Sequence, residues 1–456
     1  MARAKKEAAL TPEERLQAAL VPDWEWPYKL SGNWCWTRIT VITDILNGFA
    51  FKSQHYSSAG IRIIRITNVQ DGFIQDKKPV YYPLVSQKEI TPFMLKDGDF
   101  LMSLTGNVGR VAIIDASFLP AALNQRVACL RIKSEDSVRK EYIFYFCLQK
   151  QFVSDCIKSA KGSAQLNMST EWLKEYPIPL PPLAEQQRIV DRIKSLFAKL
   201  DEAKEKAQAV VDSFETRKAA ILHKAFTGEL TAKWREEHGI SIDNWKTTRF
   251  DSVAAIRSNL VDPAEYQSFP HIAPDNIEKK TGVLLEYHTI AEDGVTSGKH
   301  RFYSGQILYS KIRPYLSKAV VVDFDGLCSA DMYPIEAYQN ARCLWYYMLS
   351  DEFLLQASTA GSRSVLPKIN QKELSALTVH LPTNDREQEE IARILDELFD
   401  KEQRAKVAAE SVLEQIDTIK KSILSRAFRG ELGTNDPSEE SAVELLRQVI
   451  EQEDGD

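Results

Sequence analysis

The sequence predicts an α+β protein: two similar mixed α/β units separated by two long antiparallel helices that form a coiled coil. The first observation is a repeat. Residues 225–230, Ala-Phe-Thr-Gly-Glu-Leu, return at 427–432 as Ala-Phe-Arg-Gly-Glu-Leu, an offset of 202 residues from 225 to 427. Solenoid repeats run about 20–50 residues, so a repeat this long holds a whole domain and a connector. A duplicated chain can fold around an internal pseudo-two-fold axis.

The repeat extends into the globular parts. Asn33-Trp34 returns as Asn244-Trp245, and the aromatic segment 141–156 returns as 342–357. The offset differs between these matches, which places insertions and deletions in the globular parts. We therefore divide the chain into an N-terminal arm, two globular units, two helical spacers, a connector and an acidic tail. In that scheme the boundaries are 1–30 (arm), 31–177 (first unit), 178–230 (central helix), 231–245 (connector), 246–379 (second unit), 380–432 (distal helix) and 433–456 (tail).

Each globular unit alternates short strand-like runs with turns and then gives an aromatic helix. In the first unit the runs are at 61–66, 100–104 and 110–114, and the helix is expected at about 138–158. The second unit repeats this with runs at 306–310 and 318–322 and a helix at about 340–357. We interpret both aromatic helices as core elements.

The second main observation is a heptad seam in each helical segment. Apolar residues alternate three- and four-residue steps over about 183–226, and again after 385, with Arg217 and Glu402 as exceptions. A single exposed seam of this length would aggregate, so we expect the two helices to pack on each other, with a coiled-coil homodimer as the alternative. The seam residues are Ile189, Ile193, Leu196, Leu200, Ala203, Ala207, Val210, Phe214 and Ile221, then Ile391, Leu395, Leu398, Ala405, Ala409, Val412, Ile416, Ile419 and Ile423.

Composition excludes several classes of protein. At 44% hydrophobic and 27% charged residues, the 456-residue chain is typical of a soluble protein. It has no apolar run long enough to span a membrane, and its N-terminus lacks the apolar core of a signal peptide, so we expect a cytoplasmic protein. Six cysteines show no Cys-x-x-Cys spacing, which favours buried thiols.

Charge is unevenly distributed along the chain. The net charge is −6, yet residues 431–456 hold nine acids and one arginine. Residues 31–176 carry 18 basic and 13 acidic side chains, and residues 246–376 carry 14 and 15. A chain charged in this way would bind a polyanion weakly by itself and would need a basic partner.

The helix boundaries carry a family resemblance. Leu-Pro-Pro-Leu-Ala-Glu-Gln-Gln at 180–187, Gly-Glu-Leu at 228–230 and 430–432, and Leu-Thr-Ala-Lys-Trp-Arg at 230–235 resemble the specificity subunits of type I restriction–modification systems. With the two units and two helices, the resemblance covers essentially the whole chain. The second helix start, 381–388, is interpreted as keeping only Leu-Pro and Gln of the first.

The resemblance implies a non-catalytic, sequence-specific DNA reader. Each globular unit would be a target-recognition domain for one half of an asymmetric split target, with the helices fixing the gap. Two methyltransferase subunits that use S-adenosylmethionine would flank it, and two motor-nuclease subunits that use ATP and Mg²⁺ would join them. The resemblance implies no cofactor in this chain itself.

The residues support the absence of catalysis. The chain has no phosphate-binding Gly-x-x-x-x-Gly-Lys loop, no Gly-x-Gly-x-x-Gly and no Asn/Asp-Pro-Pro-Tyr/Phe methyltransferase signature. Its seven histidines form no metal-ligand pattern. Pro274-Asp275 with Glu278 and Lys280 imitates a nuclease motif, but Asn276 aligns with Asn68, so we interpret the segment as a turn. The alternatives are a free-standing enzyme and a self-sufficient DNA-binding regulator without methyltransferase partners.

Base readout needs side chains such as Arg, Lys, Asn and Gln on loops or helices. Three segments of the first unit offer them: a strand at 62–68, a glycine-rich loop at 103–110 and a loop at 161–167. We select Arg62, Arg65, Asn68, Ser103, Thr105, Asn107, Arg110, Lys161, Ser163, Gln165 and Asn167 as candidate DNA-binding residues, with ordinary solvated loops as the alternative.

The equivalent segments of the second unit differ in sequence, which predicts a different half-site. The candidates there are His271, Asn276, Tyr309, Lys311, Arg313, Tyr315, Lys318, Arg363, Ser364 and Lys368. Tyr315 suits stacking on a base or sugar, with a packing role as the alternative. The Gly-Glu-Leu turns, the arm and a tail helix at 440–452 are expected to contact partners, with a solvated tail as the alternative.

Overall fold

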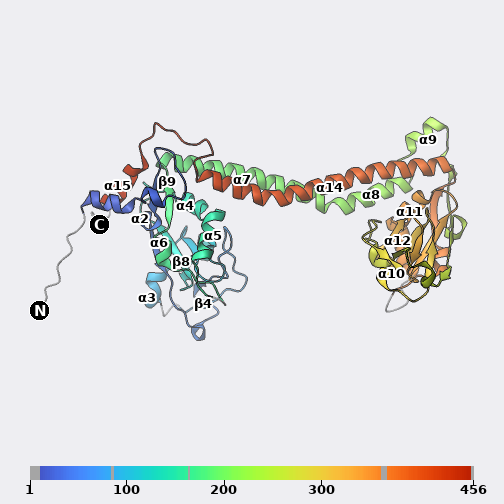
Figure 1. Cartoon of the computed structure of the whole chain (residues 1–456), viewed down its shortest axis with the longest axis horizontal. Helices are drawn as coiled ribbons and strands as arrows, with labels where there is room; N and C mark the ends of the chain where they lie inside the picture. The colour runs from blue at the N-terminus through green and yellow to red at the C-terminus, as the bar shows by residue number, and fades with distance from the viewer. Residues whose placement is uncertain (1–10, 84–86, 163–164, 361–366, 453–456) are drawn as a thin grey trace. The chain divides into compact units, whose positions relative to one another are not determined.

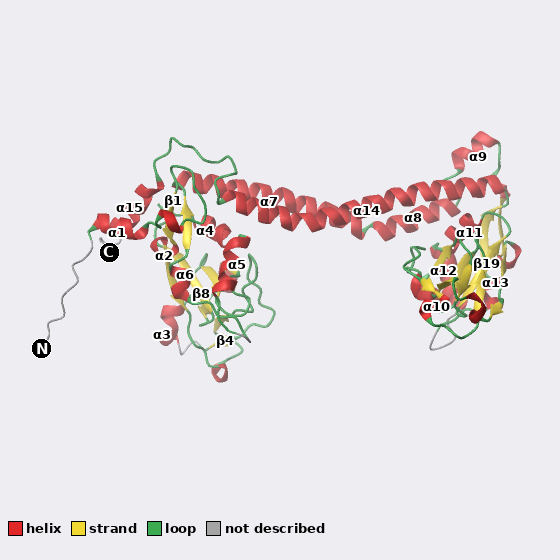
Figure 2. Ribbon diagram, in the orientation of Figure 1, coloured by secondary structure: helices red, strands yellow, loops and turns green. Residues whose placement is uncertain are grey.

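The computed structural model describes residues 11–83, 87–162, 165–360 and 367–452. The chain forms two compact units, each of which holds one α/β domain and parts of both long helices (Figure 1). Unit 1 consists of residues 1–205 and 412–456, and unit 2 of residues 206–411. Strands and the short helices that cover them are distinguished by colour in Figure 2.

Three sheets form the α/β domain of unit 1. An antiparallel sheet has the order β2 (Thr43–Asn47), β8 (Val127–Ile132), β5 (Phe100–Ser103), β6 (Val111–Ile113). A second has the order β4 (Tyr81–Tyr82), β3 (Ile61–Ile64), β7 (Ala121–Leu123), with β3 and β7 parallel. The third pairs β1 (Cys35–Arg38) with β9 (Pro177–Leu180).

Unit 2 repeats this topology. Its sheets have the orders β11 (Ala254–Ile256), β19 (Met332–Ala337), β16 (Ile307–Ser310), β17 (Ala319–Val321), and β10 (Trp245–Arg249) with β20 (Thr378–Pro382). The third sheet has the order β12 (Leu260–Val261), β15 (Lys299–Phe302), β18 (Gly326–Cys328), β13 (Pro270–Ile272), β14 (His288–Thr289), where β13 and β18 are parallel as β3 and β7 are. The strands β12 and β15 extend this third sheet beyond its counterpart.

The short helices surround these sheets. Unit 1 has α1 (Pro12–Ala19), α2 (Ile39–Ile42), α3 (Gln87–Ile90), α4 (Lys140–Cys147), α5 (Lys150–Ser159), α6 (Thr170–Lys174) and α15 (Ala442–Gln452); unit 2 has α9 (Ala232–His238), α10 (Ile290–Asp293), α11 (Ala341–Met348), α12 (Asp351–Ala360) and α13 (Gln371–Ala376). Each predicted aromatic helix is therefore two helices. The break falls at Gln149 in one unit and at Ser350 in the other. Both helix pairs contribute buried side chains to the main cores, as predicted.

The long helices run antiparallel within each unit. In unit 1, Ile189 and Ile193 of α7 (Leu183–Asp212) share a core with Leu424 and Phe428 at the end of α14 (Asp385–Ala427). In unit 2, Leu222 and Phe226 of α8 (Phe214–Phe226) share a core with Ile391 and Leu395 near the start of α14. Low residue numbers of one helix meet high numbers of the other in both units, so the predicted pairing is confirmed.

The first long helix is interrupted at Ser213, where the sequence predicted continuity. The Ser213 hydroxyl donates to the Ala209 carbonyl at 2.5 Å, and the Arg217 guanidinium donates to the Val210 carbonyl at 3.2 Å. These side-chain donors compete for the carbonyls of the turn. Arg217 also forms an ion pair with Glu402 at 2.7 Å. The two exceptions in the apolar seams are therefore partners of each other.

A buried glutamate stands in the first turn of each long helix. Glu185 accepts from the Trp34 indole at 2.9 Å, and Glu387 accepts from the Trp245 indole at 3.0 Å. Both carboxylates are fully buried. A helix N-terminus favours negative charge, and each indole supplies one hydrogen bond to a carboxylate that has left water. The long helix and the first strand of each α/β domain are thereby joined.

The next residue, a glutamine, closes the same junction. The Gln186 amide donates to the Pro181 carbonyl, and its oxygen accepts from the Arg139 backbone at 2.8 Å, just before α4. Gln388 donates to the Pro382 carbonyl, and its oxygen accepts from the Asn340 backbone at 3.3 Å, just before α11. The interpretation that the second helix start keeps only Leu-Pro and Gln is therefore wrong. One inserted residue hides the shared Glu-Gln pair.

The acidic tail is packed rather than solvated over its described part. The helix α15 lies against α1 and α2, with Leu446 and Ile450 buried in the main core of unit 1. Arg188 forms a bidentate pair with Glu439 at 2.7 and 2.8 Å. The helix begins two residues later than predicted.

The structure bears on two predictions made from composition, buried thiols and the absence of a membrane span. All six cysteines are buried and unpaired, and burial raises the pKa of the Cys35 thiol to about 12. Among the described helices, none is long and apolar enough to cross a membrane.

The Glu387 junction gives a stability prediction. Arg235 of α9 donates to Glu387 at 2.8 Å and its side chain is only 10% exposed. Arg235→Ala should destabilise unit 2 by about 3 kcal/mol, because removing one partner leaves a buried charge uncompensated. Hydrogen exchange of peptides from 231–250 and urea unfolding measure the effect. Lys233→Ala on the same helix removes an exposed side chain and should change stability by less than about 0.5 kcal/mol. Equal effects of the two changes would contradict a supporting role for the pair.

Candidate nucleic-acid interface

The glycine-rich loop and the third segment of unit 1 lie together. Thr105 and Asn167 form an isolated antiparallel bridge, and the Thr105 hydroxyl donates to the Asn167 side chain at 3.2 Å. The Gly106 amide donates to the Leu166 carbonyl at 2.9 Å. Gly106 has a φ of +74°, a conformation that glycine adopts without strain. Two segments about 60 residues apart in sequence thus form one surface.

Unit 2 joins its equivalent loops in the same way. Ile312 and Lys368 form an isolated antiparallel bridge. The Arg313 amide donates to the Pro367 carbonyl at 2.7 Å, and the Ile369 amide to the Lys311 carbonyl at 2.9 Å. Arg313 has a φ of +49°, an uncommon value for a residue with a side chain. Such backbone outliers occur often at functional sites.

A basic side chain ties the first segment of each unit to its loop. Arg110, just before β6, donates to Gln70 at 3.1 Å and pairs with Asp71 at 3.5 Å, both of which follow the first segment directly. Lys318, at the start of β17, donates to the Pro274 carbonyl at 2.6 Å and lies 3.8 Å from Asp275. The three predicted segments are therefore contiguous in both units.

Seven of the candidates have exposed side chains on this surface. Exposure makes a side chain available to a nucleic acid, and the two sets differ in chemistry: mostly amides in unit 1, and cations with an aromatic ring in unit 2. The exposed residues are Asn107, Lys161, Gln165 and Asn167 in unit 1 and Arg313, Tyr315 and Lys368 in unit 2.

Five candidates are buried and lie outside the exposed surface. Tyr309 is 1% exposed and belongs to the main core of unit 2, and Ser103 bonds the backbone of its own loop. Asn68 accepts from the Arg65 amide and donates to the Gln75 carbonyl, so it holds its turn closed. Thr105 and His271 are also buried.

The half-buried Asn276 repeats the arrangement of Asn68. It accepts from the Ala273 amide at 2.8 Å and donates to the Glu286 carbonyl at 2.7 Å. The alignment of Asn276 with Asn68 therefore matches the geometry, and the nuclease-like segment at 274–280 is a turn. Both asparagines form part of the shared framework.

Several basic candidates already have partners inside their unit. Arg62 pairs with Asp76 at 2.8 Å and lies over two aromatic rings. Arg65 donates to the Lys78 carbonyl at 3.0 Å. Lys311 donates to the Ala330 carbonyl at 2.5 Å. These side chains position the surface. Ser163, Arg363 and Ser364 lie outside the described residues.

The sequence did not single out Gln70, which holds Arg110 in place. Its only signal is its position two residues after Asn68. The sequence also missed a hydrogen-bonded cluster in unit 2: Asp293 accepts from His271 at 2.6 Å and lies 3.3 Å from His288. The hydrogen bond from His271 lowers the pKa of Asp293. No group of three or more metal-ligating side chains occurs among the residues that the structure describes.

Comparison with known proteins identifies the family. Residues 32–211 and 242–410 match the type I restriction modification DNA specificity domain, once for each copy of the repeat. The chain belongs to this family of specificity subunits. It is a DNA target-recognition subunit of a type I restriction–modification system. No comparison supports the self-sufficient regulator.

Two relatives from Escherichia coli show the extent of the similarity. The EcoDI specificity subunit is 36% identical over 316 residues, which is 65% of this chain and 70% of the relative. The EcoBI specificity subunit is 27% identical over 426 residues, 87% of this chain and 86% of the relative. The crystal structure of the HsdS subunit from Thermoanaerobacter tengcongensis shares the fold, with a TM-score of 0.63 at 17% identity, covering 90% of this chain and all of that one.

A buried lysine in α8 of this specificity subunit gives a pH prediction. Lys218 of α8 donates to the Lys280 carbonyl at 2.5 Å, and burial lowers its pKa from the ordinary 10.5 to about 8. Between these values the unfolded chain binds more protons than the folded chain, so unfolding free energy should rise with pH from about 8 to about 10.5. Lys218→Met should flatten this rise.

Urea unfolding at pH about 7.5 and about 9.5 tests the prediction. Lys224→Met, on the same helix at an exposed position, should leave the pH dependence as in the parent chain. An unchanged slope in Lys218→Met would show that another group carries the pH dependence.

Proposed function

We propose that this specificity subunit reads an asymmetric, bipartite DNA target, with one recognition domain for each half-site. One observation carries the proposal: the two domains repeat the same backbone framework but expose different side chains on their loops. Asn68 and Asn276 hold equivalent turns by equivalent hydrogen bonds. The loops that these frameworks present differ, with Asn107 exposed in unit 1 and Arg313 and Tyr315 in unit 2. A common frame with different side chains favours two different half-sites.

The recognition domains are proposed to span 31–177 and 246–379, with the helices of 178–230 and 380–432 as spacers. The readers are proposed among the seven exposed candidates. Arg and Lys suit guanine edges or phosphates, and Asn and Gln suit adenine edges. Arg110, Lys318 and the other half-buried candidates are assigned the role of holding the loops.

The subunit is proposed to act without chemistry of its own in a cytoplasmic complex. Its sequence lacks the methyltransferase and phosphate-loop signatures, which supports catalysis by partner subunits. Two methyltransferase subunits would supply adenine methylation with S-adenosylmethionine, and two motor-nuclease subunits would supply cleavage with ATP and Mg²⁺. The net charge of −6 supports reliance on partners for DNA affinity.

Methylation mapping tests this function. The chain is expressed with its methyltransferase subunit, and N6-methyladenine is located across the genome by single-molecule sequencing. We expect a single motif of two short, different halves with a fixed gap. A methylating complex without a split motif would overturn the bipartite model.

Substitution of the unit 2 loop should affect one half-site only. Arg313→Ala should lower the rate of methylation by about 10-fold or more, because a base contact is worth about 1–3 kcal/mol. It should also relax the motif at positions within one half and leave the other half unchanged. Lys372→Ala, at an exposed position of α13 that is not among the candidates, serves as the control. Relaxation in both halves would contradict the assignment of one half to each domain.

Helix length should set the gap. Removal of one heptad from both long helices shortens each by about 10 Å. The mapped gap should then shrink by about three base pairs, at about 3.4 Å each, while both half-sites stay the same. A mutant complex that methylates the original motif with the original gap would contradict the spacer role.

A further inference from the structure

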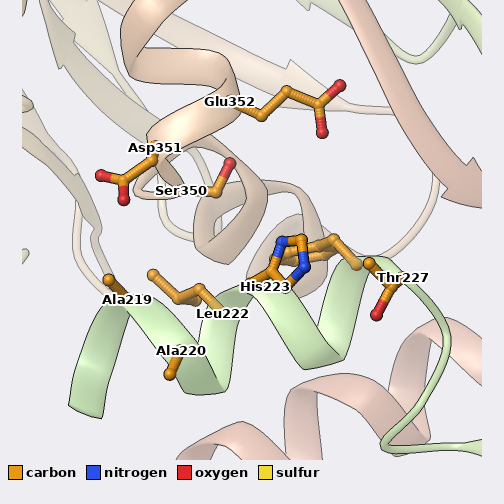
Figure 3. Close-up of a pocket in the computed structure, with 9 residues that line it drawn as sticks. Ala219, Ala220, Leu222, His223, Thr227, Ser350, Asp351 and Glu352 are labelled. Atoms are coloured by element: carbon orange, nitrogen blue, oxygen red, sulfur yellow. The ribbon is translucent and has the colours of Figure 1, made fainter. Parts of the chain in front are cut away.

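A pocket of about 350 Å³ opens in unit 2 beside the end of α8. Figure 3 shows Ala219, Leu222 and His223 of α8 on one side and Ser350, Asp351 and Glu352, at the junction of α11 and α12, on the other. Phe226, the last residue of α8, also lines it. The lining combines an apolar floor with an acidic rim.

The equivalent place in unit 1 is a pocket of about 250 Å³, and a tyrosine of the N-terminal arm, Tyr28, forms part of its lining. Residue 425 of α14 and residue 428 just after it correspond to 223 and 226 by the repeat, and 149 corresponds to 350. There the Tyr28 hydroxyl donates to the Phe428 carbonyl at 2.8 Å. Its ring packs edge-on against Trp36 at 4.9 Å, and Arg429 lies 5.4 Å from the ring centre. The tyrosine therefore has an apolar contact, a hydrogen bond and a cation.

The N-terminal arm delivers this tyrosine along a strand edge. The Val21 amide donates to the Trp36 carbonyl at 3.0 Å, and the Thr37 hydroxyl of β1 donates to the Ala19 carbonyl at 3.0 Å. The Trp36 indole then donates to the Tyr28 carbonyl at 3.2 Å. The arm follows the edge of β1 that β9 does not occupy.

Unit 2 has the same receiving surface but not the arm. Among the described residues β10, the counterpart of β1, pairs with β20 only. The connector forms α9 and a short helix at Ile242–Asn244, and its Arg235 bonds Glu387. No described group donates to the Phe226 carbonyl, the counterpart of the Tyr28 acceptor. An open strand edge and a larger pocket, without a tyrosine in its lining, thus lie where unit 1 binds its own arm.

The charges around the two pockets differ. Asp351 and Glu352 stand where unit 1 has Lys150 and Gln151, and Thr227 stands where unit 1 has Arg429. Arg429, the cation beside the Tyr28 ring in unit 1, is thus replaced by a neutral residue in unit 2. A segment that fits the pocket of unit 2 must therefore bring its own positive charge to the acidic rim.

We propose that this pocket receives a tyrosine flanked by lysine or arginine, on an extended segment of a methyltransferase subunit. The segment would run along the open edge of β10, as the arm runs along β1. Backbone pairing on a strand edge gives affinity, and an anchored aromatic ring with a basic neighbour gives specificity. The choice of a methyltransferase as the partner rests on the function proposed above.

Photocrosslinking in the assembled complex tests the contact. With p-benzoylphenylalanine at position 219, the methyltransferase subunit should crosslink through a peptide that contains a tyrosine next to a basic residue. The same group at position 224, exposed on α8 outside the pocket, is the control. A crosslink at 224 with none at 219 would overturn the proposal.

Binding titrations with labelled methyltransferase subunit give an independent readout. Ala219→Phe fills the pocket and Glu352→Lys reverses its rim, and each should weaken binding by about 10-fold or more. Asp323→Lys makes the same kind of charge change at an exposed position outside the pocket and should bind as the parent does. Glu352 is exposed and Ala219 is half-buried, so circular dichroism is used to check that both variants fold like the parent chain.

The two proposals fail in different ways. Parent-level binding by both variants, in a complex that methylates a split motif, overturns the pocket and leaves the proposed function intact. Absence of a split motif from the parent complex overturns the function. A crosslink at 219 with weaker binding by both variants supports the pocket in either case, because both measurements read the contact directly.

Discussion

The buried glutamate in the first turn of each long helix is the interaction on which the rest of each unit depends. Glu185 and Glu387 have left water completely, and each is held by a tryptophan indole: Trp34 just before β1 and Trp245 at the start of β10. A carboxylate in that position is stable only if donors surround it. Thr434 in unit 1 and Thr231 in unit 2 supply the next ones. The domain, the helix and the segment that follows the other helix are thus bound at one point.

The two junctions draw their remaining donors from different segments of the chain. In unit 1 the donors beyond the indole come from the C-terminal tail, which then folds as α15 against α1. In unit 2 they come from the connector, with Arg235 as the charged partner. The C-terminal tail thus supplies donors to the Glu185 junction, and the connector supplies them to the Glu387 junction. The N-terminal arm therefore packs in unit 1. No segment equivalent to the arm covers the edge of β10 among the described residues of unit 2.

The sequence alone predicted the duplication, the antiparallel helices and the surface loops, because these depend on hydrophobic periodicity and on repeated sequence motifs. It did not predict which way a polar side chain points. Asn68 has the right chemistry for reading a base, yet its amide is used to close a turn. The Glu-Gln pair of the second helix start was hidden by one inserted residue, which only hydrogen-bond geometry revealed. Arg217 and Glu402 were visible as exceptions in separate seams, but their pairing needed the register of the two helices.

That pairing has a consequence for how this chain can change. Arg217 and Glu402 place opposite charges within otherwise apolar seams, 2.7 Å apart and about a third and a quarter exposed. A slip of one helix by a heptad would set Arg217 against Leu395 or Ala409, and polar seam residues specify register for this reason. An insertion in one helix alone would therefore separate Arg217 from Glu402, whereas insertions of equal length in both helices on the same side of the pair would keep the two side chains together. The ion pair thus couples the length of one helix to the length of the other.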